Sequence, residues 1–171
     1  MSTEEQTNGM SLAEAIRGKR AVRTYTTDPV PTLVIDTILN AGRRAQSSKN
    51  TQPWTFILVT DREQLRRLST AGTYAGQLLN AAFAVVLVGP AETDFDLGQT
   101  AAYMQLAATA HGVGSCITTL HDQAAAHAIL GVPDELTCLW SIAFGYPAEP
   151  PKPLKAGGRK PLHEVVRRER Y

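Results

Sequence analysis

The stretch RRAQSSKNTQPWTFILV, residues 43–59, is the most informative part of the chain. It contains a polar loop over 46–53, with two serines, a lysine, an asparagine and a glutamine close together. An apolar segment follows at once, and its length and composition are typical of a core strand. The sequence therefore raises the question of what these hydroxyl and amide groups bind, directly before the chain enters its core.

Helical patterns and apolar strands alternate on both sides of this stretch. Ser11 and Glu14 match a capping box, which predicts a helix to about Arg17. Apolar residues at every third or fourth position predict a helix from Thr32 and a long helix over 94–111, closed by Gly112 and Gly114. Further short helices are predicted over 61–70, 74–80 and 122–130, apolar strands over 55–60, 83–89, 115–120 and 136–147, and a short helix or strand over 161–171.

This alternation predicts an α+β (α/β three-layer) domain, in which helices cover both faces of one sheet. We expect the strand over 136–147 to be central and the strand over 55–60 to be buried on both faces. Residues 11–171 show no internal repeat and no domain boundary, and residues 1–10 read as a disordered lead. The stretch 147–161, rich in proline, glycine and lysine, is expected to cross the surface.

The composition limits the kinds of partner. With 171 residues the chain suits one domain, and its net charge of +1 provides no general field to attract nucleic acid or acidic lipid. The first ten residues lack the apolar segment of a signal peptide, and the longest apolar run is too short to span a bilayer, so we expect a cytoplasmic protein. Cys116 and Cys138 are interpreted as buried free thiols, with a disulfide or a metal role as alternatives.

Familiar catalytic motifs are missing from the sequence. It has no phosphate-binding loop of the GxxxxGK[ST] type, no GxSxG and no HExxH. The glycines of HGVGSC follow a helix rather than a strand, which argues against a dinucleotide loop. His111 lies where its charge can favour a helix end. His121 beside Asp122 is either an acid–base pair or, more simply, a turn with a helix cap.

Three basic clusters stand out instead. The first holds Lys19, Arg20 and Arg23, the second Arg159 with Lys160 after a double glycine, and the third surrounds Lys49. Guanidinium groups bind phosphate through paired hydrogen bonds, and backbone amides of glycine-rich turns can add to that binding. A basic cluster can also be an ordinary solvated face. The residues by themselves thus indicate an α/β domain with a possible phosphate-bearing ligand.

The sequence resembles the FMN-dependent nitroreductase family in consecutive features: RAVRTY at 20–25, DPVP at 28–31, the following helix and SSKNTQPW at 47–54. The same family is matched by the alanine-rich helix running into HGVGSC, the strand ending in FGYP, and Arg159 followed by KPLHEVV. The resemblance therefore covers about residues 11–167. It implies a nitroreductase-like fold with a central, mostly antiparallel sheet flanked by helices. It also implies a homodimer with flavin at the subunit interface.

The resemblance implies which residues hold FMN. Basic residues would bind the phosphate and the ribityl chain, polar loop residues would reach the flavin from the other subunit, and a strand end would follow the ring edge. Near Thr119 or Leu120 a backbone amide would donate to the flavin N5 atom, so no side chain need be catalytic. The implied set is Lys19, Arg20, Ala21, Arg23 and Arg159 for the first role, Ser47, Ser48, Asn50 and Gln52 for the second, and Thr118, Thr119 and Leu120 for the third.

The implied activity is that of an oxidoreductase, in which NADPH or NADH reduces the flavin and a nitroaromatic, quinone or related acceptor is then reduced in a ping-pong cycle. A flavin-binding protein with little turnover, specialised flavin chemistry on the same scaffold, and a domain without cofactor are the alternatives. Some positions depart from the family pattern. Gln46 replaces a frequent proline, Ala21 a frequent serine, and the TTL segment an acidic-glycine pair.

Overall fold

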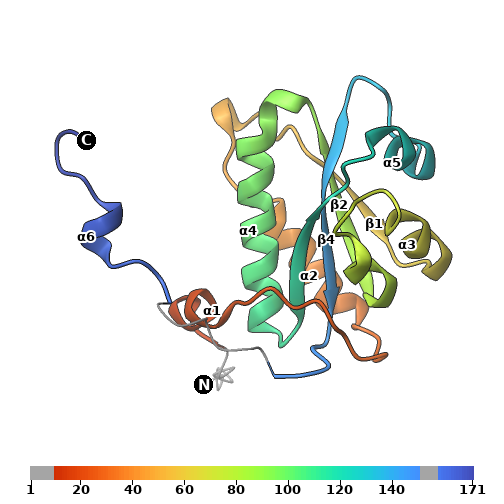
Figure 1. Ribbon diagram of the computed structural model, residues 1–171, viewed down its shortest axis with the longest axis horizontal. Coiled ribbons are helices and arrows are strands. Elements are labelled where there is room, and N and C mark those ends of the chain that lie inside the picture. Colours follow the sequence, from red (N-terminus) through yellow and green to blue (C-terminus); the bar gives the residue numbers. More distant parts are fainter. Residues whose placement is uncertain (1–9, 151–157) are drawn as a thin grey trace, which may run out of the picture.

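The computed structural model describes residues 10–150 and 158–171. Its centre is a four-stranded antiparallel sheet in the order β1-β2-β4-β3 (Figure 1). The predicted α+β class and the central position of the strand over 136–147 are confirmed. Residues 1–9 of the expected lead, and 151–157 of the expected surface stretch, lie outside the described residues. The strands are β1 (Thr55–Val59), β2 (Phe83–Gly89), β3 (Gly114–Thr119) and β4 (Thr137–Gly145).

Helices form at the predicted places. The Ser11–Glu14 capping box is present, and Asp61 caps the helix that follows it. The α-helices are α1 (Leu12–Gly18), α2 (Thr32–Gly42), α3 (Arg62–Leu68), α4 (Asp94–Ala110), α5 (Gln123–Leu130) and α6 (Leu162–Val165). The 3₁₀ helices are η1 (Ser48–Asn50), η2 (Gly76–Asn80) and η3 (Ala91–Thr93).

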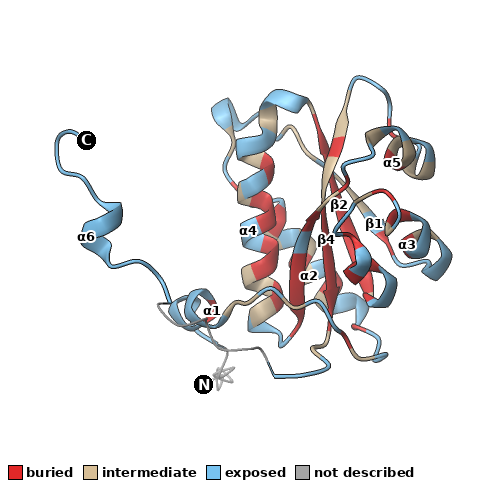
Figure 2. Ribbon diagram, viewed as in Figure 1, coloured by how far each residue is buried: buried red, intermediate tan, exposed pale blue. Residues whose placement is uncertain are grey.

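The sheet separates two apolar clusters and makes the domain three-layered. Helices α2 and α4 pack on one face, where Phe83 stacks on Phe144. Helices α3 and α5 cover the other face together with η2. Figure 2 shows the buried residues along the strands and on the side of α4 that faces the sheet. All seven residues of β2 are buried, as a strand between two layers and two neighbouring strands requires.

Two expectations about local structure were wrong. Strand β1 is not buried on both faces, because it forms an edge of the sheet and leaves Leu58 41% exposed. Gly114 does not close α4. It is the first residue of β3, and Gly112, with φ of +70°, provides the left-handed turn after the helix. The interpretation of Cys116 and Cys138 as free, buried thiols is confirmed.

In the part of the chain that the structure describes, no helix has the length and apolar character needed to cross a membrane. Helix α6 lies apart from the sheet, beyond α1 (Figure 1). Leu162 and Val165 on this short helix are 75% and 61% exposed. Apolar side chains this exposed on a projecting segment indicate that another surface can cover them.

Candidate functional site

The segment after α1, residues 19–25, is fixed against the beginning of β3. The Val22 N–H donates to the Ser115 carbonyl oxygen at 3.0 Å, and the Tyr25 hydroxyl donates to the Val22 carbonyl oxygen at 2.6 Å. Gly114 permits this approach, because a Cβ atom there would lie 2.8 Å from Cβ of Val22. Burial raises the pKa of Tyr25 above its ordinary range, so the phenol keeps the proton that it donates.

Three of the predicted cations gather beside this segment. Burial lowers the pKa of Lys19, and the positive charge of Arg159 acts in the same direction. Burial raises the pKa of the Cys116 thiol, while Arg23 and Lys19 oppose that increase. Lys19 therefore lies near both Cys116 and Arg159, and Arg23 lies near Cys116. We call Lys19, Arg23 and Arg159 the cation cluster.

The cation cluster has no carboxylate partner within the described ranges. The two ion pairs found there join Arg66 to Glu63 and His127 to Asp134. Like charges held together cost free energy unless an anion accompanies them. The cluster is therefore suited to an anionic ligand with several oxygen atoms, and phosphate is the common biological group of that kind.

Arg20, predicted in the same role, is oriented differently. Its guanidinium Nη1 donates to the carbonyl oxygens of Arg17 at 2.7 Å and of Lys19 at 2.8 Å. These bonds fold the side chain back over the end of α1. Ala21 is exposed and bridges to Ser115 through the backbone, which is compatible with its predicted backbone role.

Strand β3 is an edge of the sheet, so its backbone groups that do not pair with β4 face outward. The Leu120 N–H donates to the Leu139 carbonyl oxygen at 2.8 Å, and Thr119 lies opposite Trp140. Residues of an antiparallel pair alternate between bonded and non-bonded positions, so the Thr119 N–H points away from β4. Thr118 is buried, and its hydroxyl donates to the Tyr74 carbonyl oxygen at 3.0 Å.

Residues 71–77 run beside β3 in the opposite direction. The Asp122 N–H donates to the Ala71 carbonyl oxygen at 2.9 Å, and at the other end Nε2 of Gln77 lies 3.8 Å from Sγ of Cys116. Gln77 is only 9% exposed, so its amide is a polar group in an almost closed position beside the cation cluster. The sequence reasoning missed Gln77, because one glutamine in a short apolar segment forms no pattern.

The polar loop has an unusual backbone. Lys49, Asn50 and Gln52 have φ of 50°, 56° and 50°, values that non-glycine residues rarely adopt. Oγ of Ser47 accepts from the Gln52 N–H at 2.9 Å, which holds the loop in this shape. Ser48, Asn50 and Gln52 are exposed. A strained loop that keeps polar side chains available is typical of ligand-binding segments.

Within one chain this loop and the cation cluster lie at opposite ends of α4. The carbonyl oxygen of Pro53 would be 2.6 Å from a Cβ at Gly89, the residue that leads through η3 into α4. The segment 19–25 lies against Gly114, just after the helix ends. A helix of 17 residues is about 25 Å long. The structure thus joins the cation cluster to the edge of β3, and it does not join Ser47, Ser48, Asn50 and Gln52 to them.

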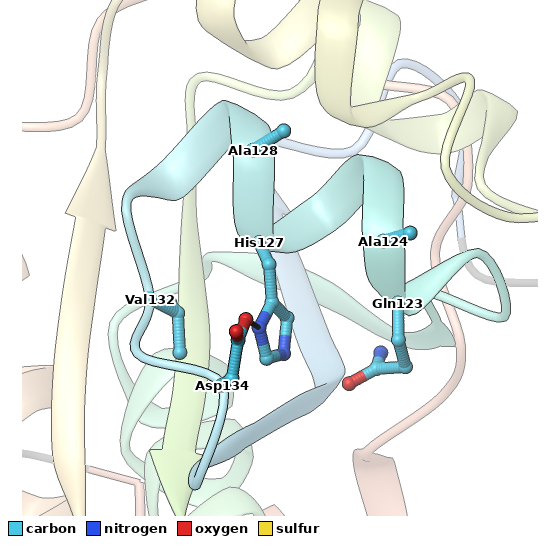
Figure 3. A pocket seen from close by; sticks show the side chains of 6 residues that line it. All are labelled: Gln123, Ala124, His127, Ala128, Val132 and Asp134. Atoms are coloured by element: carbon cyan, nitrogen blue, oxygen red, sulfur yellow. Dashed lines mark ion pairs between the residues drawn. The ribbon is translucent and has the colours of Figure 1, made fainter.

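A separate hollow lies on the outer side of α5 and contains none of the predicted site residues (Figure 3). Its volume is about 520 Å³, and His127 points there toward Asp134, with Nδ1 3.8 Å from Oδ1. Two weakly paired polar groups in an open hollow provide little to recognise a ligand. The candidate site remains the region along β3.

Comparison with known proteins agrees with this architecture. The sequence profile of the nitroreductase family matches residues 16–83 and 73–146. An NADPH-flavin oxidoreductase of Vibrio harveyi is 30% identical over 179 residues, which cover 92% of this chain and 73% of that protein. An NADH dehydrogenase of Thermus thermophilus is 28% identical over 189 residues, which cover 86% of this chain and 91% of that protein.

A solved structure shares the fold as well. The FMN-dependent nitroreductase of Clostridium difficile R20291 superposes with a TM-score of 0.83 at 28% identity, covering 92% of this chain and 98% of that one. The family profile spans most of the described domain, and the antiparallel sheet between two helical layers is the fold of this relative. The chain belongs to the nitroreductase family.

Proposed function

We propose that the protein is an FMN-dependent oxidoreductase that uses NADPH or NADH to reduce nitroaromatic, quinone or related acceptors by a ping-pong cycle. The observation that carries the proposal is the cation cluster, Lys19, Arg23 and Arg159, without a carboxylate partner among the described residues, at one end of an open strand edge. The names of the relatives, which include flavin, FMN, NADH and NADPH, support the same assignment.

The residues along β3 suit contacts with both the phosphate and the ring of FMN. The cation cluster would hold the phosphate, and the N–H of Thr119 would donate to the flavin ring. Cys116 and Thr119 are separated by three residues of strand, about 10 Å, so one extended molecule can contact both. Gln77 offers its buried amide at the Cys116 end.

We further propose that the site is completed in a homodimer. One chain cannot bring the polar loop to the cation cluster, because the length of α4 separates them. A second copy can supply Ser47, Asn50 and Gln52 to the flavin of the first. The exposed Leu162 and Val165 of α6 support a second copy on this side of the fold, since contact with it would remove them from water.

The chemistry on this site follows from what its residues can and cannot do. Bound flavin would supply two-electron redox chemistry, accepting hydride from the nicotinamide and passing it to the acceptor. The cation cluster would neutralise the phosphate, and the fixed N–H of Thr119 would orient the ring edge. The strained loop would exclude water from the side that the second chain covers. The protein contributes the position of the flavin and the electric field around it, rather than a nucleophile.

A visible absorption spectrum of the purified protein, followed by addition of NADPH or NADH without air, tests the proposal. Flavin bands that bleach on addition are expected, and the nucleotide that bleaches them identifies the donor. Bands that persist with both nucleotides would indicate a flavin-binding protein with little turnover. Absence of the bands after soaking with FMN would contradict the proposed cofactor.

A further inference from the structure

We propose that His121 is a catalytic acid, which protonates the acceptor at the moment when the acceptor is reduced. This inference rests on the proposed oxidoreductase function and adds a residue to it. His121 lies two residues after Thr119, the last residue of β3, whose N–H points away from β4. Two residues of extended chain span about 7 Å. His121 therefore lies close to the position proposed for the flavin ring edge.

A hollow of about 220 Å³ lies beside this histidine. Residues 70–73 form one wall, and His121 with Asp122 forms the other. The walls are held together, because the Asp122 N–H donates to the Ala71 carbonyl oxygen and because Gly72 lies directly against the carbonyl group of Thr119. The volume suits a single small ring, and the hydroxyl of Thr73 adds a second polar group that can face a carbonyl or nitro oxygen.

The helix-cap interpretation of this dipeptide explains Asp122 and leaves His121 without a role. Oδ1 of Asp122 accepts from the Ala125 N–H at 3.0 Å and caps α5. The imidazole of His121 makes no hydrogen bond to any residue of 10–150 or 158–171, and it is exposed. Asp122 is the other titratable group that lines the hollow.

The proton balance of acceptor reduction gives His121 its role. When a quinone becomes a hydroquinone, it takes up one hydride, from the reduced cofactor, and one proton. The proton leaves Nε2 of the imidazolium and forms an O–H bond at the carbonyl oxygen of the quinone. Because His121 is exposed, water returns a proton to the ring after each turnover. An imidazole can donate a proton from one ring nitrogen and recover it from water, which suits His121 to this step.

His121→Gln tests the assignment, with His111→Gln as the matched control at the other end of β3. The protein is loaded with FMN, reduced with the nucleotide that bleaches it, and mixed rapidly with 1,4-benzoquinone or with ferricyanide between about pH 5.5 and 8. Reduction of the quinone consumes a proton, whereas ferricyanide takes one electron and no proton. We expect His121→Gln to slow quinone reduction by about tenfold or more at the acidic end and to remove its fall with rising pH.

The control and the second acceptor make the outcome decisive. Ferricyanide rates, FMN affinity and bleaching should match those of the unmodified protein, and His111→Gln should match it throughout. Quinone rates in His121→Gln that keep the original magnitude and pH profile would overturn the assignment while the proposed function stands. Equal slowing with both acceptors would also overturn it, by indicating a structural role. Failure to bind FMN would overturn the proposed function and this assignment together.

Discussion

The backbone N–H of Leu120 is bonded to the carbonyl oxygen of Leu139, at 2.8 Å. Of the two amides expected to serve the flavin ring, this one is occupied inside the sheet. Thr119, opposite Trp140 at the alternate register position, has its N–H directed to the open edge. The structure thus favours Thr119 over Leu120 as the backbone donor.

Thr119→Pro removes this single N–H, and proline is tolerated where a strand edge faces outward. We expect FMN to bind about tenfold more weakly, which corresponds to the loss of one hydrogen bond. Titration of FMN absorbance measures the affinity. Ile117→Pro is the matched control, because its N–H also points outward but lies toward the cation cluster. Equal affinities for Thr119→Pro and Ile117→Pro would contradict the role of the Thr119 amide.

The sequence pattern predicted most of the fold, because local signals and burial agree over much of the chain. The capping box at Ser11, the periodic helices and the apolar β2 each follow from residues close together in sequence. The wrong prediction for β1, that both of its faces are buried, has a different cause. A short apolar strand looks the same at an edge or in the centre of a sheet, and only long-range pairing decides which position it takes.

The candidate site was harder to predict than the fold. Residue type identified Lys19 with Arg23 and, separately, Arg159 as basic clusters, and the family resemblance assigned both clusters to the phosphate. The structure places Arg159 near Lys19. The direction of Arg20, the choice of Thr119 over Leu120 and the burial of Gln77 depend on hydrogen bonds between segments far apart in sequence. No pattern in a single sequence encodes such bonds.

Tyr25→Phe should change how stability responds to alkaline pH. Burial raises the pKa of Tyr25, so the folded state holds the phenol proton more tightly than the unfolded chain, whose tyrosine pKa is about 10. Its contribution is complete below about pH 10 and is lost as the pH rises toward the folded value, by at most about 1.4 kcal/mol per pH unit.

Urea unfolding at several pH values measures this effect. The Phe variant should be about 1–2 kcal/mol less stable at pH 8, since the carbonyl oxygen of Val22 loses its phenolic donor. Above about pH 10 its free energy of unfolding should fall less steeply than that of the unmodified protein, although Cys116 and Cys138 still titrate in both. An equally steep fall of the free energy of unfolding in both proteins would contradict a buried, protonated phenol.

Arg23→Ala tests the phosphate role of the cation cluster. A guanidinium that binds a phosphate contributes about 1.5–3 kcal/mol, so FMN affinity should fall by about 10- to 100-fold. Riboflavin has the same ring without the phosphate, and its affinity should change little. Arg66→Ala, in an exposed pair with Glu63 on α3, is the control for general charge loss. If FMN and riboflavin affinities fell equally, Arg23 would act on the ring rather than on the phosphate.

Mixing two defective chains tests whether one flavin site uses both subunits. Arg23→Ala spoils the cation cluster, and Asn50→Ala spoils the polar loop. If the loop serves the partner's flavin, a mixed dimer pairs the intact Arg23 of one chain with the intact Asn50 of the other. Random exchange of equal amounts should then restore about a quarter of the flavin sites, measured as tightly bound FMN after gel filtration, while each variant alone retains little.

The control is to mix each variant with itself under the same exchange conditions, which should restore nothing. A mixture that binds no more FMN than the average of its two components would show that both residues serve the same chain's site. That result would conflict with the separation of the loop from the cation cluster along α4, about 25 Å within one chain. Restoration, in contrast, would explain why the polar loop is strained and exposed in one chain, since its binding partner would lie on the other subunit.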